Sequence, residues 1–231
     1  MIPSQRLRIE GVAAPLIVRR NARAKRISLR VDGGGEAVIV VLPHRARLQD
    51  GIEVARTNAG WIAKQLEALP ARVPFVDGTA LPVLGRMRTI CHDPGARAGV
   101  REDGDVLRIG GPDGRVALHI SAWLKRHARA AIAEAIGRKA VQLGRSPRRI
   151  MLRDTRSRWG SCSATGTLSF SWRLVLAPPE VLDYVVAHEM AHMLVHGHGP
   201  DFWRLAGDLA DDLTTGRVWL KKHGYTLFRY G

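Results

Sequence analysis

The first clear periodicity in the chain is an alternation of apolar and polar residues. Ile27, Leu29 and Val31 are separated by polar residues, and a glycine-rich segment follows at residues 32–35. The next run, at residues 36–42, is rich in β-branched residues. Two runs of this kind joined by a short glycine-rich turn are typical of a β-hairpin. We therefore expect paired strands on the two sides of this turn.

Apolar residues then recur at helical spacing over residues 49–69. The residues of this stripe are Ile52, Ala55, Ala59, Ile62, Leu66 and Leu69. The spacing predicts one helix, and Pro70 is expected to stop it because proline lacks the N–H that would continue the ladder. Short strands are expected in the Gly-, Pro- and Asp-rich part that follows, at residues 80–84, 87–91, 105–109 and 115–120.

A second helix is predicted after residue 120. Ser121 suits its N-cap, an apolar stripe runs through residues 124–143, and Gly144 suits the left-handed residue that ends many helices. Pro178 and Pro179 open a third helix, since a proline in the first turn removes no hydrogen bond. The segments between these two helices are expected to form a strand, a turn and a strand, at residues 149–154, 159–162 and 167–174.

Length and pattern together indicate an α+β fold. The chain has 231 residues, which is enough for one large domain or for two small ones. We expect a β-rich N-terminal region with one helix at residues 1–120. The rest of the chain, residues 121–231, is expected to hold the other two helices and the strands between them.

The chain is strongly basic, with a formal net charge of +15 and a pI of about 11.1. This charge favours an anionic partner such as nucleic acid, because Lys and Arg displace phosphate counterions. The basic residues are scattered and few aromatic residues lie between them, which also fits an arginine-rich solvated surface. Nucleic acid is therefore one possible partner among several.

The sequence shows none of the patterns of a membrane or secreted protein. No apolar run approaches the roughly 20 residues that span a bilayer, and the N-terminus does not match a secretory signal. Two cysteines, Cys91 and Cys162, are too few for a typical disulfide scaffold. We expect a cytoplasmic protein.

The third predicted helix contains the motif His188-Glu189-Met190-Ala191-His192, an HExxH pattern. Histidines four residues apart lie on one helical face, so both imidazoles can reach one ion. Zinc is the ion typical of this pattern. Glu189 is expected to act as a general base toward the attacking water and not to bind the metal.

A catalytic zinc site takes a third protein ligand and keeps one position open. His198 lies six residues after His192 and would face the wrong way on a continuous helix. We expect Gly197 to end the helix in a left-handed conformation, so that His198 turns back to the ion. His196 is the alternative third ligand, disfavoured because it precedes this turn. The spacing equals that of the metzincin HExxHxxGxxH pattern, although Val195 replaces its glycine.

The sequence around this motif resembles that of the YgjP-like metallopeptidases, which are relatives of the SprT-like group. The similarity is carried by Arg158-Trp159-Gly160-Ser161-Cys162, by residues 166–174 and by residues 178–189. Residues 197–203 resemble the family's NHSxxFW element, with Gly197 in place of Asn and Gly199 in place of Ser. That element supplies the third metal ligand of the family, which corresponds to His198. Weaker similarity in the N-terminal region extends the resemblance over most of the chain.

The resemblance implies a compact zincin-type domain at residues 121–231. A support helix, residues 121–143, would pack against a small antiparallel sheet, and the active-site helix would lie beneath that sheet. The strand around residues 168–172 would border the cleft and pair with an extended substrate backbone.

Other residues are candidates for supporting roles. Trp159 and Cys162 could line the cleft, but a structural role is favoured for both. Phe202 and Trp203 are expected to pack the third-histidine loop onto the core. Candidates to orient an imidazole are Asp201, Asp208, Asp211 and Asp212. Candidates to stabilise an oxyanion are Tyr225 and Tyr230.

These features favour a zinc-dependent metallohydrolase, most naturally a metallopeptidase acting on a peptide or protein. A zinc-dependent nucleotide phosphohydrolase is an alternative that the arginine excess would suit, although the sequence has no Walker-type glycine-rich loop. A nucleic-acid-associated protease or binding protein is the other alternative.

Overall fold

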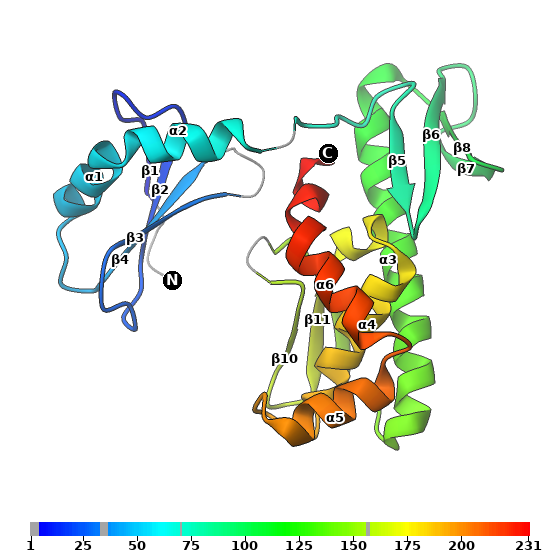
Figure 1. The fold of residues 1–231 in the computed structure, drawn as a ribbon. Helices are drawn as coiled ribbons and strands as arrows, with labels where there is room; N and C mark the ends of the chain where they lie inside the picture. The colour runs from blue at the N-terminus through cyan, green and yellow to red at the C-terminus, as the bar shows by residue number, and fades with distance from the viewer. Residues whose placement is uncertain (1–4, 33–36, 70, 156–157) are drawn as a thin grey trace. The chain divides into compact units, whose positions relative to one another are not determined.

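The computed structural model describes residues 5–32, 37–69, 71–155 and 158–231. The chain divides into two compact units, Met1–Arg72 and Val73–Gly231, and Figure 1 shows the helices and strands of each. Both units combine helices with small sheets, which confirms the α+β class. The expected boundary between residues 120 and 121 falls inside helix α3 (Val116–Leu143), so the structure places the division earlier, after Arg72.

A four-stranded sheet in the order β1-β2-β4-β3 forms the base of the first unit. Its strands are β1 (Gln5–Leu7), β2 (Leu16–Arg20), β3 (Ser28–Val31) and β4 (Val38–Leu42). The antiparallel pair of β3 and β4, with Val31 opposite Val38, confirms the predicted strand pairing. The predicted glycine-rich turn lies mostly at residues 33–35, outside the described residues.

Two helices cover this sheet where the sequence predicted one. Helix α1 (Leu48–Thr57) and helix α2 (Ala59–Glu67) are separated by Asn58, whose side-chain Nδ2 donates to the carbonyl of Val54 at 2.7 Å. An asparagine side chain that bonds to the backbone competes with the helical ladder, which accounts for the break. Pro70, expected to stop the helix, lies outside the described residues.

The second unit contains two sheets. The first, in the order β5-β6-β8-β7, consists of β5 (Ala80–Val83), β6 (Arg86–Asp93), β7 (Gly99–Asp103) and β8 (Val106–Gly110). Three of these strands were predicted, and β7 was not. The second sheet, in the order β10-β11-β9, consists of β9 (Arg149–Arg153), β10 (Gly160–Cys162) and β11 (Thr167–Ser171).

The second sheet departs from the expectation in three ways. It is mixed and not antiparallel, because β11 pairs antiparallel with β10 but parallel with β9. Residues 160–162, expected in a turn, form strand β10. Strand β11 ends at Ser171, and the expected strand residues beyond it belong to the 3₁₀ helix η2 (Trp172–Leu176).

The segment 115–120 was predicted as a strand, but residues 116–120 form the first turns of helix α3, so this prediction was wrong. Val116, Leu118 and Ile120 alternate in the sequence, but Leu118 is 58% exposed while Val116 and Ile120 are buried. A spacing of four between buried residues is that of a helix face. The N-cap is therefore Arg115 and not Ser121. Gly144, with φ 64°, ends the helix in the left-handed conformation, as predicted.

Helix α3 joins the two cores of the second unit. Residues of its first half, such as Trp123 and Leu124, pack into the core that includes the strands β5, β6 and β8. Residues of its second half, such as Ile132 and Ile136, pack into the core that includes β11 and helix α4 (Pro179–Ala191). At about 1.5 Å per residue, its 28 residues extend for about 42 Å. It runs the length of this unit in Figure 1.

The chain after α4 forms α5 (Pro200–Leu209), α6 (Leu213–His223) and the 3₁₀ helix η3 (Gly224–Arg229). A further 3₁₀ turn, η1 (Asp113–Arg115), precedes α3. Among the described residues, no helix combines the length and the apolar character needed to cross a bilayer.

A buried ion pair holds three of these helices together. Lys139 of α3 donates to the Asp183 carboxylate of α4 at 2.5 Å and to the carbonyl of Leu209, at the end of α5, at 2.8 Å. The second carboxylate oxygen of Asp183 accepts the backbone N–H of Asp211 at 2.9 Å. Lys139 is 1% exposed and Asp183 3%. Both charges are therefore satisfied, as burial requires.

We expect Asp183→Ala to lower the free energy of unfolding by about 3–5 kcal/mol, because the variant leaves a buried ammonium group without its counter-charge. Urea unfolding followed by tryptophan fluorescence measures this, since five of the six tryptophans lie in the second unit. Arg204→Ala is the control, because it removes an exposed pair with Asp201 and should cost at most about 1 kcal/mol. Equal effects of the two substitutions would contradict the role of the buried pair.

Candidate active site

Helix α4 carries the first two candidate histidines. It begins as predicted, with Pro178 as N-cap and Pro179 in its first turn. His188 and His192 lie one turn apart on the same side of the helix, both partly buried. Glu189 is only 6% exposed. The helix thus presents two imidazoles and a buried carboxylate from within a mostly apolar surface.

The chain reverses immediately after this helix, earlier than expected. Helix α4 ends at Ala191, and the carbonyl of Ala191 accepts the N–H groups of both Leu194 and Val195. Arg145 of the segment after α3 holds this turn through a 3.0 Å hydrogen bond to the carbonyl of Met193. The turn at residues 192–195 therefore sends the chain back toward the helix.

Gly197 does not have the role that was predicted for it. Its φ does not lie in the positive, left-handed region, so it does not form a left-handed cap. The earlier turn at residues 192–195 already accomplishes the reversal. His198 nevertheless returns to the helix, as expected.

The three histidines converge on one point. Nε2 of His198 lies 3.2 Å from Nε2 of His188 and 3.2 Å from Nε2 of His192. The candidate ligand atoms of the three residues lie within 4.8 Å of one another. His196, the alternative, is exposed and does not belong to this cluster. Two imidazoles bound to one zinc ion at 2.0–2.1 Å with tetrahedral angles lie about 3.3–3.4 Å apart, so the observed spacing fits such an ion.

The protonation states also suit a metal. Burial lowers the pKa of His188 to about 4, and repulsion from His192 and His198 acts in the same direction. Burial likewise lowers the pKa of His192. Nδ1 of His192 lies 3.0 Å from the carbonyl of Val195, and a proton donated there leaves the lone pair on Nε2. Neutral imidazoles with Nε2 free are the form that binds a metal ion.

Phe202 forms a platform beneath the three imidazoles. This fully buried ring has its centroid 4.9 Å from the ring centroid of His188, 4.4 Å from that of His192 and 4.7 Å from that of His198. Trp203 lies beside it, with its ring centroid 5.9 Å from those of His188 and His198. The prediction that these two residues pack the third-histidine loop onto the core is confirmed.

Strand β10 passes very close to Glu189 because residue 160 is glycine. A Cβ at Gly160 would lie 2.5 Å from Cγ and from Oε1 of Glu189. The backbone N–H of Cys162, two residues further on, donates to the Glu189 carboxylate. Burial raises the pKa of Glu189 to about 7, while the Arg158 guanidinium and the Cys162 N–H favour the charged form. The strand therefore fixes the carboxylate beside the histidine cluster.

The strand that borders the site is β10 and not the predicted strand at residues 168–172. In the sheet order β10-β11-β9, strand β11 is paired on both sides, whereas β10 is at the edge. Trp159, just before β10, both lines the site and stacks on Phe228 with ring centroids 5.0 Å apart. Burial raises the pKa of the Cys162 thiol, which fits the favoured structural role for this cysteine.

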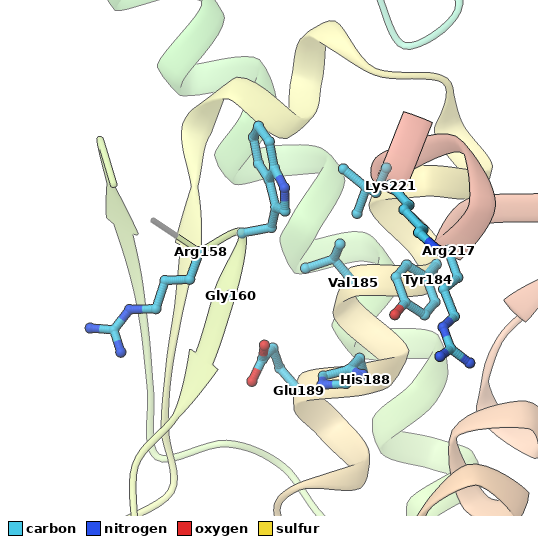
Figure 2. Close-up of a pocket in the computed structure, with 10 residues that line it drawn as sticks. Arg158, Gly160, Tyr184, Val185, His188, Glu189, Arg217 and Lys221 are labelled. Carbon is cyan, nitrogen blue, oxygen red and sulfur yellow. The ribbon is translucent and has the colours of Figure 1, made fainter. Parts of the chain in front are cut away.

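A pocket of about 390 Å³ opens beside Glu189 and His188 (Figure 2). Sequence reasoning missed two of the groups in it, Tyr184 of α4 and Arg217 of α6. Tyr184 lies one turn before His188 on the same helix, and that spacing could have indicated it. The residues that line the pocket are Arg158, Trp159, Gly160, Tyr184, Val185, His188, Glu189, Arg217, Leu220 and Lys221.

The other candidates from the sequence are not among the groups at this site. Tyr225 and Tyr230 are not among the residues that line the pocket. Asp201 pairs with Arg204, and Asp212 caps α6 by accepting the N–H of Thr215 at 2.9 Å. In the described part of the chain, none of the four aspartates forms a hydrogen bond or ion pair with an imidazole.

Comparison with known proteins identifies the family. The family model described as YgjP-like, metallopeptidase domain, matches residues 25–223. The chain belongs to the YgjP-like metallopeptidase family. It is thus a metal-dependent peptidase, as expected. No curated protein matches the sequence.

Two solved structures resemble parts of this YgjP-like metallopeptidase. One is the metallopeptidase zymogen of Pyrococcus abyssi abylysin, with 18% identity and a TM-score of 0.35, over 39% of this chain and 93% of that chain. The other is the metallopeptidase zymogen of Methanocaldococcus jannaschii jannalysin, with 21% identity and a TM-score of 0.34, over 39% of this chain and 92% of that chain.

We expect Gly160→Ala to lower kcat/KM for peptide hydrolysis by about 100-fold, because the added methyl group must displace the Glu189 carboxylate or the strand. The matched control is Gly207→Ala, where a Cβ meets nothing within 4 Å and should leave kcat/KM unchanged. Metal content and urea unfolding, measured for both variants, separate a displaced carboxylate from a misfolded protein. Wild-type activity in Gly160→Ala would show that the close contact is not needed.

Proposed function

We propose that this metallopeptidase is a zinc enzyme that hydrolyses peptide bonds, with His188, His192 and His198 as metal ligands and Glu189 as general base. The observation that carries the proposal is the convergence of three imidazoles beside a buried carboxylate. Three protein ligands with a fourth position open are the arrangement of catalytic zinc, whereas structural zinc sites use four protein ligands. A bound zinc ion would supply the Lewis acidity that polarises the scissile carbonyl.

Glu189 has the position that a general base needs. Its carboxylate is held by the N–H of Cys162 and lines the same pocket as His188. A carboxylate in this position can accept a proton from the attacking water and deliver it to the leaving amine. Because β10 and α4 both fix it, little reorganisation is needed during the reaction.

The edge strand β10 supports a peptide as the substrate. An edge strand offers backbone N–H and C=O groups to an extended chain, and an added strand would pass directly beside Glu189. A substrate held through its backbone is bound largely independently of its side chains. This mode suits peptide bonds better than the phosphoanhydride of a nucleotide.

We expect Glu189→Gln to lower kcat by about 10²–10⁴-fold while the metal content stays at the wild-type level, because the amide keeps the shape but cannot accept the proton. Peptide hydrolysis and metal analysis on the same preparations check this. Unchanged turnover in the variant would rule out Glu189 as the base.

We expect His198→Ala to lose most of its bound metal, because two imidazoles remain where three converge. His196→Ala is the matched control: this exposed histidine lies two residues away and should keep the wild-type metal content. Elemental analysis after purification gives both the identity and the stoichiometry of the ion. Loss of metal in His196→Ala and its retention in His198→Ala would reverse the ligand assignment.

A further inference from the structure

Two cationic side chains of helix α6 line the pocket beside the histidine cluster. Arg217 and Lys221 lie one turn apart on α6, and both belong to the wall of the pocket that also contains His188 and Glu189 (Figure 2). Glu189 is the one acidic residue among those that line it, in the part of the chain that the structure describes. The wall formed by α6 is therefore positive, and with Arg158 the lining carries three cationic side chains against one carboxylate.

A glycine places Arg217 there. A Cβ at Gly216 would lie 2.4 Å from Cβ of Tyr184 and 2.8 Å from the carbonyl oxygen of Glu180. Glycine thus lets α6 cross α4 with the two backbones almost in contact. Because Tyr184 lies one turn before His188 on α4, the residue after Gly216 reaches the edge of the site.

An aromatic ring holds the guanidinium of Arg217. Its Cζ lies 4.5 Å from the centroid of the Trp203 ring, which in turn lies 5.9 Å from the ring centroids of His188 and His198. A guanidinium stacked on a ring keeps the N–H groups at its edge free for hydrogen bonds. The stacking therefore positions the group without using up its donors.

These two cations lack the ion pairs that other basic residues of this unit have. Arg138 pairs with Glu134 and Arg108 with Asp103. In the regions that the structure describes, no ion pair is found for Arg217 or Lys221. Arg217 is exposed and stacked on a ring, so its charge remains available to an anionic ligand.

We propose that Arg217, assisted by Lys221, binds a carboxylate of the substrate close to the scissile bond. The inference rests on the proposed function, because it names the substrate class of that same site. A planar guanidinium matches a carboxylate through two parallel hydrogen bonds. An Asp or Glu side chain and the free carboxylate at a peptide's C-terminus carry the same group, and the experiment separates these two sources.

A synthetic peptide library tests the preference. The peptides vary at the positions that flank the cleaved bond, and each is made with a free and with an amidated C-terminus. For the metal-loaded wild type we expect kcat/KM to be roughly ten-fold higher for Glu than for Gln at the preferred position, with the difference mainly in KM. If Arg217 binds the C-terminal carboxylate, amidation lowers kcat/KM and the change from Glu to Gln does not.

Two variants and a control assign the effect to Arg217. We expect Arg217→Gln to remove the preference and Arg217→Glu to reverse it toward Lys-containing peptides. Lys222→Gln removes the same charge from an exposed residue of the same helix that does not line the pocket, and it should retain the wild-type preference. Calorimetric binding of the preferred library peptide to Glu189→Gln, with and without Arg217→Gln, gives a readout that does not depend on turnover.

The outcomes separate the two proposals. If the wild type cleaves acidic and neutral peptides at equal rates, the carboxylate site is overturned and the peptidase mechanism stays intact. If the metal-loaded enzyme cleaves none of the library but hydrolyses nucleoside triphosphates, both proposals fall. A preference that survives in Arg217→Gln and is lost in Lys222→Gln overturns the assignment to Arg217.

Discussion

Three imidazole nitrogens, each a hydrogen-bond distance from the next, form the interaction on which the rest of this structure depends. Unprotonated Nε2 atoms in this arrangement would repel one another, and burial disfavours added protons on His188 and His192. The fold must therefore hold His188, His192 and His198 against this tendency. It does so with the buried ring of Phe202, the turn after Ala191 and the Nδ1 contact of His192 to a carbonyl. A shared cation converts the same arrangement from repulsive to attractive.

Two glycines set the distances around helix α4. Gly160 lets strand β10 approach Glu189, and Gly216 lets helix α6 approach Tyr184, so that a Cβ at either glycine would lie within 2.5 Å of the helix's side chains. The pocket lies between these two elements, with its lining drawn from both. The width of the site is thus determined by how closely the backbones of β10 and α6 approach α4. A substrate entering this space meets a carboxylate held from one element and a guanidinium held from another.

The sequence predicted the chemistry of the site better than its surroundings. His188 and His192 lie close together in the sequence, so the helical period of 3.6 residues is enough to place both on one face. A third histidine beyond a break could also be expected. The break itself was assigned to Gly197, because glycine is the usual left-handed residue, whereas the chain turns at residues 192–195 through backbone hydrogen bonds of ordinary residues. Arg217 was missed because its place depends on the crossing of α6 and α4, which no local pattern encodes. The segment 115–120 was misassigned as a strand because residues four apart share a face both in a strand and in a helix. The buried pair Val116 and Ile120 therefore fits either element.

The role of each basic residue in this chain depends on the group that its side chain contacts. In the sequence each arginine adds equally to the net charge of +15, and the sum favours an anionic partner. In the structure Arg173 is 6% exposed and donates to Asp154 and to the carbonyls of Leu227 and Tyr230, so it serves the fold. Lys139, buried against Asp183, does the same. Cations of this kind are already neutralised and cannot attract a ligand. Arg217 differs because a ring and not a carboxylate holds it, and its side chain lines the pocket beside His188 and Glu189.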